Sequence, residues 1–164
     1  GDPTVDGTFL GSLTRPQQMD VLADQVADAT AKGANLLLGG KRADQKGFYF
    51  NPTVLSNVNH SMKVMMDESF GPIIGIQKVR GDDEALELML DTPYGLTSAV
   101  FTTDENRALE LMQQLNSGTV YWNCCDRVSP NIPWSGRGSS GLGSTLSNAG
   151  IRTFVQPKSY HLRG

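Results

Sequence analysis

The fold of this chain is decided by the stretch LTSAVFTTDENRALELMQQLNSGTVYW, which covers residues 96–122. Residues 96–101 predict a strand, and Thr102 with Glu105 fits the capping box that begins a helix. A glycine ends this helix, and residues 119–122 predict a second strand. A strand, a helix and a strand joined by short links predict a crossover unit with parallel strands. The helix carries four apolar residues at helical spacing: Ala108, Leu111, Met112 and Leu115.

The same alternation begins earlier in the chain. Residues 73–79 predict a buried strand, and Asp82 or Asp83 caps a helix that follows it. The order from residue 73 is therefore strand, helix, strand, helix, strand. This order predicts an α/β fold with a largely parallel sheet covered by helices. The apolar residues that share a face of the first helix are Ala85, Leu86, Met89 and Leu90.

The N-terminal third predicts a long helix followed by short elements. Thr14 and Gln17 fit a capping box with Pro16 in the first turn, and Gly33 ends the helix. Its inward residues are Met19, Leu22, Val26 and Ala29.

Three short elements follow this helix. Residues 36–38, all leucine, predict a buried strand, and Pro52 makes the segment around it an edge strand or irregular. Residues 61–67 predict a short helix. Near the C-terminus, Phe154, Val155 and residues 160–162 predict a last short strand.

The bulk composition excludes several classes of protein. The chain has 164 residues, 38% hydrophobic and 19% charged, which is typical of one soluble globular domain. No apolar run approaches the ~20 residues of a membrane-spanning helix, so no membrane partner is expected. A net charge of -3 gives no drive towards nucleic acid. The start at Gly1-Asp2-Pro3, without a signal peptide, suggests a piece of a longer protein.

Cysteine and histidine usage predicts a reducing, cytoplasmic setting and no metal site. The only cysteines, Cys124 and Cys125, are adjacent and therefore rarely form a disulfide. His60 and His161 lie far apart and have no metal-ligand spacing. Nothing in the sequence aligns Cys125 with His161 as a nucleophile and base.

A glycine-rich run at residues 136–141, GRGSSG, matches the dinucleotide fingerprint G-x-G-x-x-G. The surrounding sequence does not fit. The run follows a loop and not a strand, and no acidic residue occurs after Asp126 to hold a ribose hydroxyl. We therefore do not expect a phosphate-binding loop here.

Two stretches carry side chains suited to ligand binding. At residues 65–72, Glu68 and Phe70 lie two positions apart ahead of a strand. They could bind a ligand with one polar and one flat part, or Phe70 could fill the core while Asp67 and Glu68 are solvated. The second stretch follows the strand at residues 119–122, where ligands bind in parallel sheets. It supplies Asn123, Cys124 and Asp126 and then the apolar loop residues Val128, Ile132 and Trp134.

Several ordered motifs resemble the NAD(P)-dependent aldehyde dehydrogenase superfamily. Glu68-Ser69-Phe70-Gly71-Pro72 resembles its Glu-x-Phe-Gly-Pro motif, and residues 118–123 resemble its Gly-Thr-Val-x-x-Asn strand. Further pieces fall in the family's order over almost the whole chain: Gly1-Asp2-Pro3, residues 32–34 before Gly39-Gly40, residues 51–55, residues 92–96, and Pro133, Gly136 and residues 140–143.

The resemblance implies the C-terminal part of the family's catalytic domain, over residues 1–164. It implies a three-layer, mostly parallel sheet with helices on both faces. The nucleophilic cysteine, the general base and the cofactor domain are then expected upstream of Gly1, with no catalytic residue in this chain. The implied activity is NAD- or NADP-dependent oxidation of an aldehyde to a carboxylic acid through a cysteine thioester. The chain alone is expected to be inactive.

The resemblance also assigns roles to individual residues. Glu68 corresponds to the glutamate that holds the nicotinamide ribose, and Phe70 to the aromatic beside the nicotinamide. The residues that fall where the family lines its substrate entrance are Cys124, Asp126, Val128 and Trp134.

Departures from the family pattern concern the substrate and not the reaction class. Gly11-Ser12 replaces Gly-Pro, residues 134–136 replace Phe-Gly-Gly, and residues 143–147 alter a Gly-Arg-Glu-Leu-Gly run. Two alternatives remain open: an acylating, coenzyme A-dependent relative, and a non-catalytic assembly or binding module. The resemblance implies a homodimer or homotetramer, with residues 150–164 as a tail used in subunit contacts.

Overall fold

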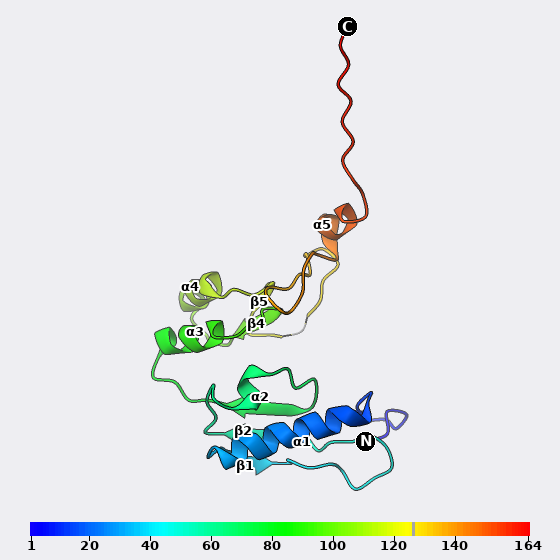
Figure 1. The fold of residues 1–164 in the computed structure, drawn as a ribbon. Coiled ribbons are helices and arrows are strands. Elements are labelled where there is room, and N and C mark those ends of the chain that lie inside the picture. Colours follow the sequence, from blue (N-terminus) through cyan, green and yellow to red (C-terminus); the bar gives the residue numbers. More distant parts are fainter. Residues whose placement is uncertain (126) are drawn as a thin grey trace. The chain divides into compact units, whose positions relative to one another are not determined.

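The computed structural model describes residues 1–125 and 127–164, which form two compact units, Gly1–Val79 and Arg80–Gly164 (Figure 1). The first unit contains a three-stranded sheet, and the second contains a two-stranded sheet. Each sheet includes a parallel strand pair, and helices pack on both. The predicted α/β class is therefore confirmed.

The first unit begins with the long helix and builds a mixed sheet. Its strands lie in the order β1-β2-β3, with β1 antiparallel to β2 and β2 parallel to β3. In chain order, the elements are α1 Pro16–Ala31, β1 Asn35–Leu38, β2 Thr53–Ser56, α2 Lys63–Met66 and β3 Ile73–Ile76.

Helices α1 and α2 cover the same face of this sheet. Leu55 of β2 is fully buried against Ala29 of α1 and Met62, the residue before α2. A second cluster joins the N-terminal half of α1 to Phe50. The four apolar residues predicted to face inward from the helix, Met19, Leu22, Val26 and Ala29, are all buried.

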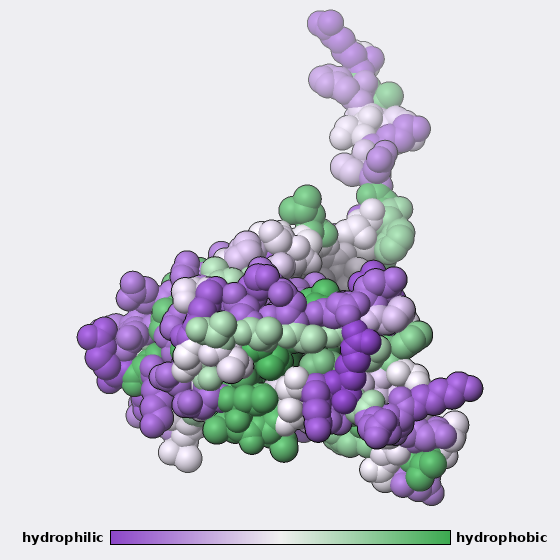
Figure 2. All heavy atoms as spheres, turned by 60° about the horizontal axis from the view of Figure 1, so that its bottom comes forward, coloured by the Kyte–Doolittle hydropathy of each residue, from purple (hydrophilic) through white to green (hydrophobic). Residues whose placement is uncertain are grey.

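The opposite face of the sheet is exposed, which corrects two predictions. Residues 36–38 form a strand as expected, but all of β1, at one edge of the sheet, is exposed. The predicted strand at 73–79 ends at Ile76, and Ile74 and Ile76 are exposed on it. Figure 2 shows hydrophobic patches among the hydrophilic surface on one side of the molecule.

The second unit contains the predicted crossover. Strands β4 and β5 are parallel, in a register that pairs Thr97 with Thr119 and Val100 with Trp122. Helix α4 connects them and buries Ala108, with Leu115 buried just beyond its end. The elements are α3 Asp82–Leu90, β4 Thr97–Val100, α4 Glu105–Gln114, β5 Thr119–Trp122 and α5 Ser147–Arg152.

The N-cap residues of three helices differ from the predicted ones by one to two positions. Helix α1 begins at Pro16 as expected, but its N-cap is Arg15, with no side-chain cap from Thr14. Helix α3 begins after Gly81, so Asp82 lies inside its first turn. Helix α4 is capped by Asp104, whose carboxylate accepts from the backbone N–H of Arg107 at 3.1 Å. The predicted capping boxes are therefore wrong, although the helices are correct.

The glycine-rich run at 136–141 packs against the backbone around Gly95. The Gly95 carbonyl accepts from the N–H groups of Gly118 and Arg137, both at 3.0 Å, and Ser140 Oγ accepts from the Gly95 N–H. A Cβ on Gly118 would lie 1.5 Å from the Ser135 carbonyl oxygen. The glycines therefore permit close backbone approach, and the run does not link a strand to a helix.

The predicted strand at 154–162 is wrong, because residues after α5 form an extended, exposed tail. In Figure 2 this tail is largely hydrophilic beyond its base. Its exposed residues include Phe154 and Val155. Within the described part of the chain, no helix has the length and apolar character needed to cross a bilayer.

Candidate functional site

The loop between α2 and β3 presents Glu68 and Phe70 to solvent. Helix α2 stops at Met66, and the Asp67 N–H still donates to the Lys63 carbonyl at 2.8 Å. Glu68 is exposed, and the side chain of Phe70 is 76% exposed. The interpretation that Phe70 fills the core is therefore wrong. Phe70 and Glu68 are instead both exposed, which fits the alternative that they bind a ligand with one flat and one polar part.

The backbone of Phe70 adopts a left-handed conformation, with φ of 43°. This region disfavours residues with a Cβ, by roughly 1 kcal/mol, and such strain is often found at binding sites. The ring is exposed, so burial of the side chain does not explain the strain. The surrounding contacts hold the conformation.

Helix α1 holds the loop from one side. The side-chain amide of Gln18 donates to the Ser69 carbonyl at 2.5 Å. One turn later, Leu22 packs against Gly71 so closely that a Cβ there would lie 2.6 Å from Leu22 Cδ1. The Phe70 residue is thus flanked by two residues that contact one face of the same helix.

Strand β2 holds the end of the loop. The Thr53 N–H donates to the Pro72 carbonyl at 2.8 Å, and the Ile73 N–H donates to the Gly71 carbonyl at 2.8 Å. Thr53 is itself buried. The loop therefore enters β3 with its backbone fixed.

A pocket of about 450 Å³ lies beside the Phe70 ring. Arg15, the N-cap residue of α1, and Ser12 are among the residues that line it. It has polar and apolar walls, which suits a ligand with a flat and a polar part. The lining residues are Ser12, Leu13, Thr14, Arg15, Gln18 and Phe70.

Gln18 is the residue that the sequence did not single out. Gln17 was assigned to a capping box with Thr14, whereas its chemically identical neighbour Gln18 belongs to no recognised motif. The only signal is the helical spacing, which places Gln18 four residues before the inward-facing Leu22 and hence on the same face. The hydrogen bond to Ser69 then follows from the fold.

The predicted substrate residues belong to the second unit. Cys124 is half-buried just after β5, and Val128 is exposed. Trp134 is half-buried and exchanges backbone hydrogen bonds with Thr145, at 2.8 and 2.9 Å. Asp126 lies outside the described residues. A pocket of this unit that is lined by residues between 130 and 155 includes neither Cys124 nor Trp134, so their grouping stays a prediction.

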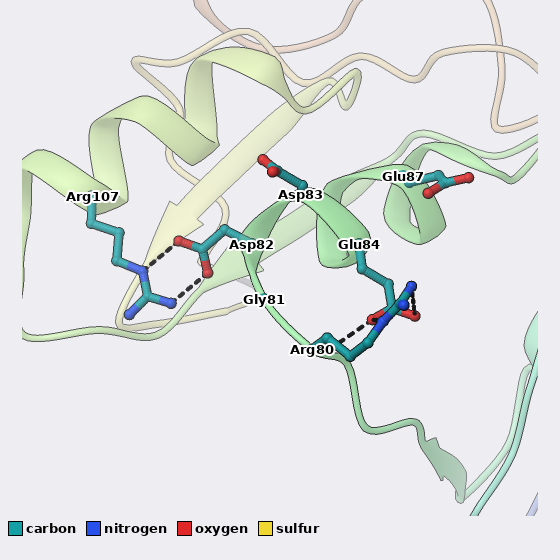
Figure 3. Close-up of a pocket in the computed structure, with 7 residues that line it drawn as sticks. All are labelled: Arg80, Gly81, Asp82, Asp83, Glu84, Glu87 and Arg107. Carbon is teal, nitrogen blue, oxygen red and sulfur yellow. Dashed lines mark hydrogen bonds and ion pairs between the residues drawn. The ribbon is translucent and has the colours of Figure 1, made fainter.

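The hollow at the start of α3 is filled by charges that pair with each other (Figure 3). The Arg107 guanidinium from α4 forms two hydrogen bonds with Asp82, which lowers the pKa of Asp82 and raises that of Arg107. Arg80 folds back onto Glu84, at 3.0 Å, and lowers the pKa of that carboxyl in the same way. Both arginines are thus already engaged, and this hollow is a poor candidate for an anionic ligand.

Metal chemistry finds no support in the described residues. No group of three or more histidine, cysteine, aspartate or glutamate residues among them could hold a metal ion. Cys124 and Cys125 are both free thiols in this part of the chain. The loop at Glu68–Phe70 therefore remains the strongest candidate.

These elements define the class of protein: an α/β protein with an exposed, strained aromatic loop ahead of a parallel strand. The Aldehyde dehydrogenase family model matches residues 1–160. The chain belongs to the aldehyde dehydrogenase family. The predicted superfamily is thus confirmed, while the position of the chain within the catalytic domain stays a prediction.

Named relatives agree with this assignment. The chloroplastic betaine aldehyde dehydrogenase of Beta vulgaris is 36% identical over 159 residues, 96% of this chain and 32% of that protein. The NADP(+) succinate-semialdehyde dehydrogenase of Deinococcus radiodurans is 37% identical, over 96% of this chain and 33% of its own length. The chain spans about a third of the length of the curated relatives it matches.

A solved structure confirms the fold. Betaine aldehyde dehydrogenase of Staphylococcus aureus, in complex with NAD+, superposes with a TM-score of 0.87 at 31% identity. The match covers 92% of this chain and 31% of that one. The chain therefore has an aldehyde dehydrogenase fold.

Proposed function

We propose that this chain is part of an NAD(P)-dependent aldehyde dehydrogenase that oxidises an aldehyde to a carboxylic acid through a cysteine thioester. The nucleophilic cysteine, the general base and the cofactor domain would lie in a part of the longer protein upstream of Gly1. The observation that carries the proposal is the Glu68–Phe70 loop. Its strained backbone presents the Phe70 ring beside a pocket, and the exposed Glu68 carboxylate lies two residues away in the sequence.

The chemistry of this loop fits the nicotinamide half of the cofactor. An exposed Phe70 ring offers a flat apolar face, and the Glu68 carboxylate has two oxygens that accept hydrogen bonds from ribose hydroxyls. When bound, the cofactor would accept the hydride that leaves the aldehyde carbon. Glu68 and Phe70 would restrict its orientation, which is how positioned groups raise the rate of such a transfer.

The substrate would enter past the second unit. Cys124, Asp126, Val128 and Trp134 are proposed to line the entrance. The relatives are named for betaine aldehyde and for succinate semialdehyde, so both compounds are suitable test substrates. Either NAD or NADP could serve, since one relative is named for NADP(+) and one solved structure contains NAD+.

The remaining proposals concern assembly and location. Residues 150–164, which comprise the end of α5 and the exposed tail with Phe154 and Tyr160, are proposed to make subunit contacts in a homodimer or homotetramer. The two free thiols support a reducing, cytoplasmic compartment.

The test uses the longer protein that carries this chain. Initial rates of NADH or NADPH formation are measured with either aldehyde, for the wild type, Glu68→Gln and Phe70→Ala. We expect each substitution to raise the KM for the cofactor at least fivefold, with a smaller effect on the KM for the aldehyde. Lys46→Ala, on an exposed loop of the same unit, serves as the control. Unchanged cofactor KM in both variants would contradict the proposed role of the loop.

Two further measurements separate the alternatives. Product analysis with and without coenzyme A distinguishes the acid-forming enzyme from an acylating relative. Wild-type longer protein without any aldehyde-dependent NAD(P)H formation would favour the non-catalytic module. The 164-residue chain alone is expected to form no NADH.

A further inference from the structure

The residues that fix Phe70 lie on α1, outside the loop that carries it. The Gln18 side-chain amide donates to the Ser69 carbonyl, and Leu22 packs against Gly71. Gln18 and Leu22 are four residues apart and therefore project from one face of the helix. Phe70 is thus held at the peptide before it and at the residue after it.

The geometry explains why the first of these contacts matters most for the ring. The Ser69 carbonyl and the Phe70 N–H belong to one planar peptide group. The φ angle of Phe70 is the rotation about the bond between its backbone N, which lies in this plane, and its Cα. Its value is 43°. With the carbonyl held, the plane cannot turn to reach the more favourable negative φ region. Without that hydrogen bond, the turn would relieve the strain and move the ring.

Helix α1 is held in place by its buried residues. Leu22 is fully buried, and Met19 and Val26 on the same side of α1 are also buried. Gln18 itself is only half-buried and borders the same pocket as Phe70. Its amide therefore reaches from a fixed helix to a strained, solvent-exposed loop.

We propose that Gln18 is a positioning residue that holds Phe70 in its left-handed, ligand-facing conformation. This inference rests on the proposed function of the Glu68–Phe70 loop. Gln18 acts through Phe70, so its removal should weaken cofactor binding only while the Phe70 ring is present.

A double-mutant cycle in the longer protein tests this directly. The KM for NAD+ or NADP+ is measured at saturating betaine aldehyde or succinate semialdehyde. The variants are Gln18→Met, Phe70→Ala and the double variant. Methionine matches the length of glutamine but has no N–H donor. We expect Gln18→Met to raise the cofactor KM about tenfold, the equivalent of one hydrogen bond, and less than twofold in the Phe70→Ala background.

Controls separate positioning from a general loss of structure. Gln17→Met makes the same chemical change on the exposed neighbour and should leave the cofactor KM unchanged. Thermal unfolding is recorded for each variant. If Gln18→Met does not fold, Gln18→Glu, which keeps the length but loses the N–H donor, takes its place.

Each other outcome overturns the inference in a distinct way. Additive effects of Gln18→Met and Phe70→Ala would show that Gln18 acts on the cofactor independently of the ring. A raised KM in Phe70→Ala alone would leave the proposed function standing and remove Gln18 from it. An unchanged KM in Phe70→Ala would overturn the proposed function of the loop and the positioning role with it.

Discussion

The side-chain amide of Asn123 pairs with both backbone polar groups of Thr102. The Thr102 N–H donates to Asn123 Oδ1, and Asn123 Nδ2 donates to the Thr102 carbonyl, each at 2.9 Å. Asn123 follows β5 directly and has φ of 53°. The amide therefore extends the β4–β5 ladder by one pair at the point where the backbone turns away.

Substitution of Asn123 separates the hydrogen bonds from the backbone strain. Asn123→Gly loses both bonds but adopts a positive φ readily, and should destabilise the chain by about 1 kcal/mol. Asn123→Ala loses the bonds and also meets the left-handed penalty, so about 1 kcal/mol more is expected. Urea unfolding measures both. Equal stability of the two variants would show that the positive φ is not retained in solution.

Gly71→Ala tests the close contact between the Phe70 loop and α1. The added Cβ would lie 2.6 Å from Leu22 Cδ1, and Leu22 is fully buried and cannot easily move. We expect a loss of about 1–3 kcal/mol in the free energy of unfolding, as for overpacking in a core. Gly11→Ala, where a Cβ would meet only ordinary contacts at 3.7 Å, is the control and should change stability far less.

Gln25 is a buried amide on α1 whose Nε2 and Oε1 atoms find no hydrogen-bond partner among the described residues. Burial of an unpaired amide costs about 1–3 kcal/mol. Gln25→Met keeps the length and removes the polar atoms, so the midpoint of urea unfolding should rise. Gln17→Leu on the exposed surface serves as the control. A lower midpoint for Gln25→Met would mean that the amide has a partner in solution.

Asp28 gives the first unit a pH-dependent link between α1 and α2. Its carboxylate accepts from Lys32 Nζ at 2.8 Å and from the Lys63 N–H at 2.9 Å, and these bonds lower the pKa of Asp28. A carboxyl with a lowered pKa stabilises the folded state above its unfolded pKa and loses that effect as the pH falls.

The corresponding experiment is a series of urea unfolding curves between pH 2.5 and 7, taken as roughly the range over which carboxyl groups titrate. The wild type should lose stability as the pH falls below about 4. Asp28→Asn should be less stable at neutral pH and show a shallower decline. Asp44→Asn, at an exposed loop position of the same unit, should follow the wild-type curve. Parallel curves for the wild type and Asp28→Asn would contradict the assignment.

The sequence predicted the order of elements because helical and strand periodicities depend on local residue type. It predicted less well where two nearby residues are both suited to the same structural role. Thr102 and Asp104 are both good N-cap residues, and only the structure shows that Asp104 caps α4. Ile74 was expected to be buried because it is apolar, but apolar character does not say which element covers a strand.

The candidate site was predictable only in part. Glu68 and Phe70 were found because they form a compact motif, and the exposure of Phe70 removed the alternative that it fills the core. Gln18 is separated from Ser69 by 51 positions, and its role depends on how α1 packs on the loop. Pairings over such distances leave no trace in a single sequence.

The leucines of β1 have a consequence for handling the protein. Leu36, Leu37 and Leu38 are exposed on an edge strand, a pattern by which a sheet can grow from one molecule to the next. Concentrated solutions of the 164-residue chain should therefore lose monomer to aggregates. A lysine in place of Leu37, the most exposed of the three at 62%, should act as a gatekeeper and slow this loss.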